Sequence, residues 1–265
     1  MAGLVVRGGV LAALVVAALA VGGALMPRMF PAVPAAVPSP SVSAAASSTS
    51  PSPGPAPSGG IRPADSFAGW ARQVAPAVRV PVGALQAYAY AEWVTSQTRP
   101  TCRLSWTTLA ALGKLATDHG TATGATLDPA SSVTPPIVGP PLDGRKGRIR
   151  VADTDAGFYD GDVTWDHAVG PMQLLPATWA VYGVDADGDQ LADPHDLDDA
   201  ALSTAYRLCA PGKDLTVADN WKTVIAAHDG VGANLQKVYD TAQAYGRQST
   251  PRPSTPTGSR PSSTS

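Results

Sequence analysis

The chain has 265 residues and a formal net charge of −2, with 19 basic and 21 acidic side chains. Charges of both signs are mixed along it, which argues against nucleic-acid binding, because that function calls for clustered lysine and arginine. The length allows one large or two small domains, but the composition of the two ends differs from that of the middle.

The N-terminal segment, residues 1–29, has the composition of an export signal. Its first charge, Arg7, precedes an uninterrupted apolar run from Gly8 to Met26. A run of about 19 residues suits either a cleaved signal peptide or an uncleaved membrane anchor. We therefore expect an exported protein. Neither cysteine lies near this segment, which excludes a lipoprotein anchor.

Two further segments, residues 30–63 and 248–265, are rich in proline, alanine, serine and glycine. Such segments bury too little apolar surface to offset the entropy lost on ordering. We expect a disordered linker before the folded domain and a disordered tail after it. The folded domain then covers residues 64–247, which is a normal size for one domain.

The folded part predicts a mainly α-helical domain with long irregular loops. Asp65-Ser66 is typical of an N-cap before the first helix, Pro81 starts a second one, and Ser105 caps a third that Gly120 ends. Residues rich in glycine, proline, threonine and aspartate follow and predict a long excursion over 121–164. Helices resume at residues 176–182, 198–209, 217–227 and 232–245.

The two cysteines, Cys102 and Cys209, lie far apart inside the folded part. In an exported protein we expect a disulfide between them, with two buried thiols as the alternative. Closing a loop of about 107 residues contributes up to ~4–5 kcal/mol by constraining the unfolded chain.

An acidic loop follows the fourth predicted helix and has carboxylates at positions 1, 3, 5, 9 and 12 of an EF-hand-like segment. Gly188 stands at position 4, Gln190 replaces the usual glycine at position 6, and position 12 is aspartate instead of glutamate. The loop predicts either a calcium site or an acidic surface turn, whereas the scattered histidines argue against zinc. The candidate ligands are Asp185, Asp187, Asp189, Asp193 and Asp196.

Three sets of residues carry a family resemblance. They are AVGPMQLLPATWAVYG at 168–183, the acidic stretches DTDAGFYDGDVTWD at 153–166 and DADGDQLADPHDLDDAALSTAYRLC at 185–209, and SWTTLAALGKLATDHG at 105–120. Together they resemble the MltB-like lytic murein transglycosylases, secreted enzymes that cut the glycan strands of bacterial peptidoglycan. The resemblance implies a lysozyme-like domain with a deep glycan cleft and a calcium-binding loop.

The resemblance also implies a catalytic position, and this chain departs from the family there. In the family one glutamate protonates the glycosidic oxygen and then acts as base, leaving a 1,6-anhydro end. The matching residue here is Ala116, which has no proton to give. Glu92 is the only glutamate of the chain, and we expect it to face solvent. Asp118 lies about 200° around the helix from position 116.

The resemblance places the other candidate site residues in a substrate-binding set. Gln173 matches a cleft-facing amide that meets the sugar, and we favour this role over the alternative, an amide that ties the Gly170-Pro171 turn to neighbouring backbone. Gly170 and Met172 belong to the same turn, with the apolar Met172 better suited to the core. His228 stands where the family usually has tyrosine, and it predicts either a substrate contact or a surface pair at a helix end.

We therefore expect an extracytoplasmic, cell-wall-associated protein that binds glycan strands with weak or no cleavage, a pseudoenzyme of this family. Calcium is the one cofactor expected, with no organic cofactor. One alternative is an active enzyme whose acid is Asp118, His228 or a carboxylate of 153–166. Another is a scaffold or regulator that docks on a cell-wall hydrolase.

Overall fold

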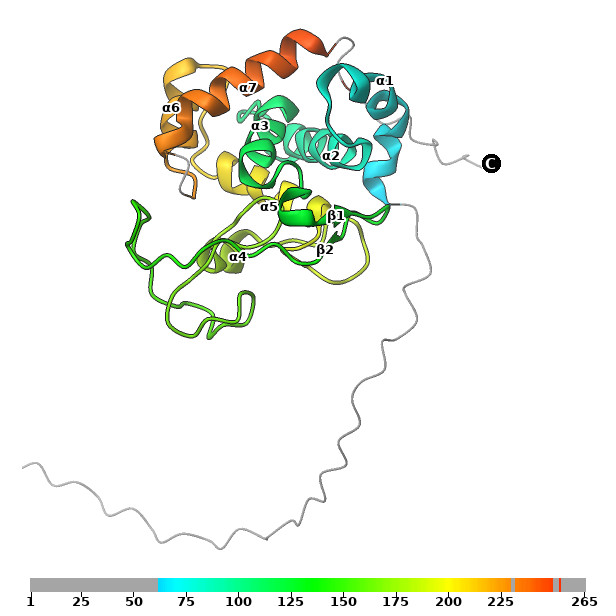
Figure 1. Ribbon diagram of the computed structural model, residues 1–265. Helices are drawn as coiled ribbons and strands as arrows, with labels where there is room; N and C mark the ends of the chain where they lie inside the picture. Colours follow the sequence, from blue (N-terminus) through cyan, green and yellow to red (C-terminus); the bar gives the residue numbers. More distant parts are fainter. Residues whose placement is uncertain (1–61, 230–231, 250–252, 254–265) are drawn as a thin grey trace, which may run out of the picture. The chain divides into compact units, whose positions relative to one another are not determined.

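A computed structural model describes residues 62–229, 232–249 and 253 (Figure 1). The chain divides into two units, residues 1–52 and 53–265, and the first lies wholly outside the described residues. The predicted signal or anchor, and almost all of the predicted linker and tail, lie outside them too. Within the described ranges, no helix combines the length and the apolar character that a membrane span requires.

The described part is mainly helical, which confirms the predicted class. Two short strands pair antiparallel, with Thr126 opposite Thr134 and Leu127 opposite Val133. The elements in chain order are η1 (Pro63–Phe67), α1 (Ala68–Val78), α2 (Val82–Thr98), α3 (Trp106–Thr117), η2 (Ala122–Gly124), β1 (Thr126–Leu127), β2 (Val133–Thr134), α4 (Pro176–Tyr182), α5 (Leu197–Cys209), α6 (Ala218–Ala226), η3 (Gly232–Asn234) and α7 (Leu235–Gln248).

Local start signals predicted some helix ends correctly and others wrongly. Ser105 caps α3 as expected, its hydroxyl accepting the Thr107 N–H. The cap predicted at Asp65-Ser66 is wrong, because the 3-10 turn η1 runs straight into α1 and the Ser66 hydroxyl donates to the Pro63 carbonyl instead. Helix α3 also ends at Thr117, before Gly120, because Asp118 already has a left-handed φ of 52°.

Helix α2 lies at the centre of the helical part and contacts α1, α3 and α5 (Figure 1). Apolar side chains on α2 and α3, such as Leu85, Tyr88 and Leu109, are completely buried. Burying a large apolar side chain contributes about 1.5–3 kcal/mol. Trp70 of α1 meets Trp106 of α3 edge to face, with ring centroids 5.2 Å apart. The hydrophobic core therefore fixes the direction of α3.

Two long-range links close this helical part. Cys102 and Cys209 form the predicted disulfide, with their Cα atoms 5.3 Å apart, and join the segment before α3 to the end of α5. Arg62 and Asp198 form a buried two-pronged ion pair, with Nε–Oδ2 and Nη2–Oδ1 distances of 2.7 and 2.9 Å. Arg62 also donates to the Pro129 carbonyl, so it ties the first described residue to the start of α5 and to the loop before β2.

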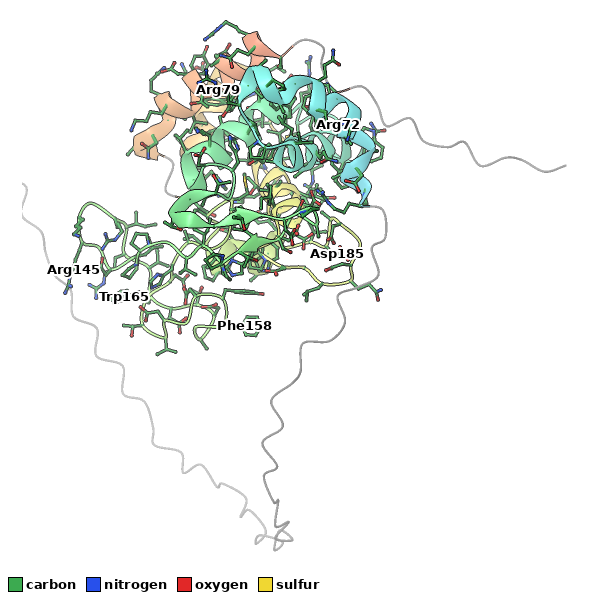
Figure 2. All side chains as sticks on the ribbon, turned by 45° about the vertical axis from the view of Figure 1, so that its right-hand side comes forward. Arg72, Arg79, Arg145, Phe158, Trp165 and Asp185 are labelled. Atoms are coloured by element: carbon green, nitrogen blue, oxygen red, sulfur yellow. A yellow bond between two sulfur atoms is a disulfide. The ribbon has the colours of Figure 1, made fainter. Side chains whose placement is uncertain are left out.

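The expectation of a long irregular excursion over 121–164 is confirmed, and the irregular segment, here called the excursion, runs on to His167. After β2, single antiparallel bridges such as Asp143–Arg150 and Ala152–Trp165 are its only regular pairings among the described residues. Phe158 and Trp165 lie on this excursion, well away from Arg72 and Arg79 on the helical part (Figure 2). Phe158 is 79% exposed, so the excursion is not built around a large apolar core.

Candidate functional site

The last turn of α3 packs directly on the Gly-Pro-Met-Gln turn. The Thr117 hydroxyl donates to the Pro171 carbonyl at 2.6 Å, across 54 residues of sequence. Ala116 precedes Thr117 and is half-buried. Two of the three motif segments from the sequence therefore meet in space, and Ala116, the position that the resemblance matches to the family's glutamate, lies in the helical turn that makes this contact.

Two members of the predicted substrate-binding set are buried in this turn. Gly170 has a φ of +71°, and a Cβ there would lie 1.7 Å from the Pro194 carbonyl oxygen, so only glycine fits. Met172 is 3% exposed, and its sulfur lies 3.3 Å from the position of a Cβ at Gly113 of α3. Both residues shape the turn, and neither offers a side chain to a ligand in this structure.

Gln173 is the member of the set that remains accessible. Its side chain is half-buried, and Nε2 donates to the Gly170 carbonyl at 3.0 Å. This hydrogen bond within the turn is the alternative role that the sequence analysis gave for Gln173. Its Oε1 lies 2.7 Å from where a Cβ at Gly139 would be. Among the described residues, Oε1 accepts no hydrogen bond. The hydrogen bond to Gly170 holds the amide in place and leaves Oε1 as an acceptor for a ligand.

His228 is buried, so the expectation of a surface pair at a helix end is wrong. It is 3% exposed, and burial lowers the pKa of its imidazole. A neutral, buried imidazole is a poor proton donor near neutral pH, which argues against His228 as a substitute acid. The neighbouring Asp229 accepts the Thr178 hydroxyl and the Leu175 N–H, and so holds the start of α4.

The chain's only glutamate is also placed far from position 116. Glu92 accepts the backbone N–H of Trp106 at 2.9 Å, so it is half-buried at the start of α3 and does not simply face solvent as predicted. Ten residues of helix, about 15 Å, separate Trp106 from Ala116. Asp118 is exposed and pairs with Lys114 on the surface of α3.

One acidic cluster lies where the calcium loop is predicted, but with a different membership. Oxygens of Asp185, Asp187 and Asp199 lie within 4.8 Å of one another; Asp185 is labelled in Figure 2. Asp199 was not predicted, because it follows the twelve-residue loop and reaches the cluster from α5.

The remaining predicted ligands lie outside this cluster and accept backbone hydrogen bonds, as the three cluster carboxylates also do. Asp189 accepts the Leu191 N–H, and Asp193 accepts that of His195. Asp196 caps α5 by accepting the N–H groups of Asp198 and Asp199.

Two carboxylates at the start of α5, those of Asp196 and Asp199, have raised pKa values because they are buried and lie close to other carboxylates. Burial, with the charges of Asp198 and Asp199, raises the pKa of Asp196 to about 8. Burial also raises the pKa of Asp199 to about 7, although backbone N–H groups of Ala186 and Asp193 partly oppose it. A bound cation relieves this kind of repulsion, which is the electrostatic setting of many hard-metal sites.

A second acidic cluster lies on the excursion and consists of Asp153, Asp155 and Asp166. Asp166 is fully buried and accepts both the N–H and the hydroxyl of Thr154. Oδ1 of Asp155 is buried and has no hydrogen-bond partner among the described residues. The sequence singled out this stretch for the family resemblance and as a source of a substitute acid, but not as a cation site.

Comparison with family models, curated proteins and solved structures gave no match. The family resemblance therefore depends on the motifs of the chain and on how the described residues bring them together.

Proposed function

We propose that the protein binds the glycan strands of bacterial peptidoglycan through a lysozyme-like domain related to the MltB-like lytic transglycosylases, and that it cleaves them weakly or not at all. The observation that carries the proposal is the contact between the last turn of α3 and the Gly170–Gln173 turn, made by the Thr117–Pro171 hydrogen bond. This contact brings the turn that contains Gln173 against the last turn of α3, where the resemblance puts the family's acid. The resemblance also supports an exported, cell-wall location.

The missing cleavage follows from the chemistry of the glycosidic bond. The leaving oxygen must receive a proton, and a positioned acid commonly accelerates this step ~10²–10⁴-fold. Ala116 supplies none. Glu92 is held at the other end of α3, Asp118 is paired with Lys114, and His228 is buried with a lowered pKa. Glu92, Asp118 and His228, the side chains considered as substitute acids, thus each have another role in the structure.

Gln173 is the residue proposed to contact the sugar. Its amide nitrogen is fixed on Gly170 while its oxygen remains an acceptor, so it suits an N–H or O–H donor of an N-acetylated sugar. Replacing Gln173 with alanine removes this acceptor and should weaken glycan binding about tenfold. Because the same amide ties the turn, a thermal melt of the variant must accompany the binding measurement.

We further propose a structural calcium ion at Asp185, Asp187 and Asp199. Three carboxylates with mutually close oxygens suit a hard cation, which takes its remaining ligands from backbone and water oxygens. The ion would neutralise the carboxylates gathered at the start of α5. Calcium should raise the melting temperature of the natural protein but not that of Asp187→Asn, whereas Asp219→Asn, a change at a 95% exposed side chain outside the cluster, keeps the response. An unchanged melting temperature of the natural protein in calcium would contradict the site.

The central test uses purified protein and insoluble peptidoglycan. The natural protein should sediment with peptidoglycan and release no 1,6-anhydro muropeptides detectable by mass spectrometry. Ala116→Glu should release them, because it restores an acid at the family's position. Ala77→Glu, which adds the same side chain at an exposed position of α1, is the matched control and should release none.

Each remaining outcome identifies an alternative. Anhydro products from the natural protein would show an active enzyme with another acid and overturn the proposal. Failure of both the natural protein and Ala116→Glu to bind peptidoglycan would also overturn it and favour a scaffold or regulator of a cell-wall hydrolase.

A further inference from the structure

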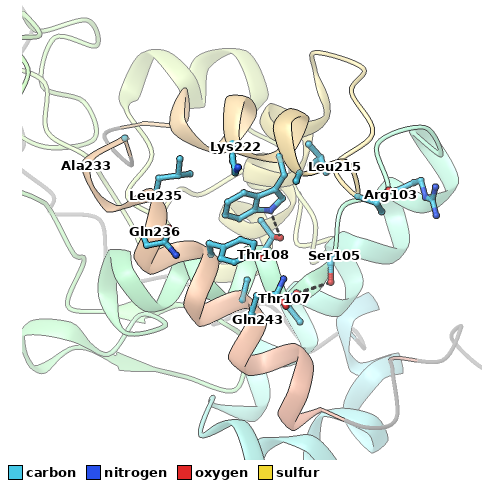
Figure 3. Close-up of a pocket in the computed structure, with 16 residues that line it drawn as sticks. Arg103, Ser105, Thr107, Thr108, Leu215, Lys222, Ala233, Leu235, Gln236 and Gln243 are labelled. Carbon is cyan, nitrogen blue, oxygen red and sulfur yellow. Dashed lines mark hydrogen bonds between the residues drawn. The ribbon is translucent and has the colours of Figure 1, made fainter.

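A groove lies at the opposite end of α3 from Ala116. It has a volume of about 840 Å³ and is enclosed by the start of α3, the segment before α6, α6 itself and α7 (Figure 3). Volumes of about 300–1,000 Å³ are typical of sites for small ligands. None of the residues in the proposed glycan site lines this groove, so a ligand here would be recognised independently.

Aromatic side chains form one wall of the groove. Trp221 of α6 and Tyr239 of α7 meet edge to face, with ring centroids 5.6 Å apart. The Trp221 indole donates to the Thr108 hydroxyl at 3.1 Å, which fixes the ring (Figure 3). Tyr239 is 42% exposed, so part of this apolar wall remains open to a ligand. Such a surface suits small apolar side chains.

Polar side chains surround this wall and offer both donors and acceptors. Thr107 and Thr216 contribute hydroxyls, and Gln236 and Gln243 contribute amides. The Thr216 hydroxyl already donates to Asp214 and the Gln236 amide to Asp240, so both keep their oxygens as acceptors. Hydroxyl and amide groups pair equally well with N–H and C=O groups, which alternate along a peptide backbone. An apolar wall beside groups of this kind is the lining that a short peptide requires.

The charge of the lining favours an anion. Of the sixteen residues that line the groove, all in the described part of the chain, Arg103 and Lys222 are cationic and none is acidic. Both side chains are about 60% exposed at the rim. Each pairs with an aspartate outside the lining: Arg103 Nη1 donates a hydrogen bond to Asp214 at 3.3 Å, and Lys222 Nζ lies 3.9 Å from Asp219. Further donors of both cations are therefore available for a carboxylate.

The start of α3 adds little to this charge, because Glu92 already accepts the Trp106 N–H there. The two side-chain cations must therefore provide the attraction for an anion. Arg103 precedes α3 and Lys222 belongs to α6, so the two cations reach the groove from different elements.

We propose that this groove binds a short peptide, holding its free carboxylate at Arg103 and Lys222 and its apolar side chains against Trp221 and Tyr239. Stem peptides of peptidoglycan present this chemistry, with free carboxylates and alanine methyl groups. The choice of stem peptides as the source rests on the proposed function. The proposal that the groove recognises a peptide carboxylate does not rest on it.

Calorimetric titration of the full chain tests the proposal with two matched ligands, diacetylated lysyl-D-alanyl-D-alanine and its C-terminal amide. The acid should bind about tenfold or more tightly than the amide, because charge-assisted hydrogen bonds are lost in the amide. Lys222→Met and Arg103→Gln should each reduce this preference. Lys237→Met removes an exposed cation of α7 that does not line the groove and should leave it unchanged.

Further variants separate this groove from the glycan site. Tyr239→Ala should weaken the acid and the amide equally, because it removes apolar wall and no charge. Gln173→Ala should not alter peptide binding, and Lys222→Met should not alter binding of peptide-free glycan strands. Equal affinity for acid and amide, or no binding of either, would overturn the groove proposal while leaving the glycan proposal intact.

Discussion

The helices and the irregular excursion between α3 and α4 are held together by different interactions. In the helical part, buried apolar side chains such as Leu85 and Leu109 fill the space between α2, α3 and α5. In the excursion, aspartate side chains accept backbone N–H groups a few residues further along the chain. Asp143 accepts from Arg145, Asp155 from Tyr159 and Asp162 from Thr164.

This difference means that the two parts should respond to different perturbations. Apolar packing is non-directional and is shared by many residues, so the helical part should unfold cooperatively. Short-range bonds to carboxylates are individually replaceable, so the excursion should open locally. A segment with weaker independent stability is also one that a ligand or an ion can order.

The largest expected effect is that of the disulfide, which closes the helical part. Replacing both Cys102 and Cys209 with alanine should lower the free energy of unfolding by up to ~4–5 kcal/mol, because the bond constrains a loop of 107 residues. Urea denaturation followed by circular dichroism measures it. An effect below about 1 kcal/mol would show that the unfolded chain is already compact.

The second-largest expected effect is that of the buried ion pair between Arg62 and Asp198. Asp198→Asn should destabilise the protein by about 3–5 kcal/mol, because it leaves the buried Arg62 guanidinium with only its longer, 3.6 Å contact to the carboxylate of Asp65. Asp118→Asn is the matched control, since it breaks an exposed pair with Lys114 that should contribute less than about 1 kcal/mol. Equal effects in the two variants would contradict the assigned role of Arg62.

Two histidines distinguish the two parts by their response to pH. Burial, with the nearby charge of Lys114, lowers the pKa of His119 to about 4. The unfolded state, with an ordinary pKa near 6.5, then binds more protons between these values, so stability is lost as pH falls from about 6.5 to about 4, by roughly 3 kcal/mol. Urea titrations at pH 7 and pH 4.5 should show a smaller loss for His119→Gln than for the natural protein.

His167 of the excursion should behave in the opposite way. Burial acts to lower its pKa, but hydrogen bonds to the Gly139 carbonyl and to Asp162 outweigh it and raise the pKa. The folded state then binds more protons, so this contribution is complete below the unfolded pKa and is lost as pH rises through the higher folded pKa. His167→Gln should therefore lose more stability at pH 5.5 than at pH 8, and a pH-independent loss would contradict the raised pKa.

The smallest expected effect is local. Asp166→Asn weakens the bonds from Thr154 to a fully buried carboxylate and should cost about 1–3 kcal/mol. Hydrogen exchange should rise in the excursion and stay unchanged in α2 and α3. Leu109→Ala should instead lower protection throughout the helical part, at a cost of about 2–5 kcal/mol. Uniform loss of protection in Asp166→Asn would show that the two parts form one cooperative unit.

Features set by nearby residues could be predicted from the sequence. Apolar periodicity and local start signals placed α4 at Pro176–Tyr182 and the other helices within a few residues of their observed bounds. The predictions failed where neighbouring residues take rare conformations. Asp118 and His119 adopt left-handed φ values and end α3 early, a conformation that residues other than glycine seldom adopt.

Features set by distant residues escaped prediction. Asp199 joins Asp185 and Asp187 only because α5 folds back along the loop, and no spacing within the loop signals it. The groove is formed by segments more than a hundred residues apart, such as Thr108 and Trp221. The role of Glu92 at the start of α3 is likewise a tertiary contact, although its being the only glutamate was a visible signal.

The Arg62–Asp198 pair also determines how the domain would carry mechanical load. Tension at Arg62 passes along the backbone into η1 and through the guanidinium to the first turn of α5. From there it runs down that helix to Cys209, where a covalent bond transfers it to Cys102. The ion pair and the crosslink thus lie at opposite ends of one buried helix, so α5 gives part of the load a path to the segment before α3 that does not pass through α1 and α2.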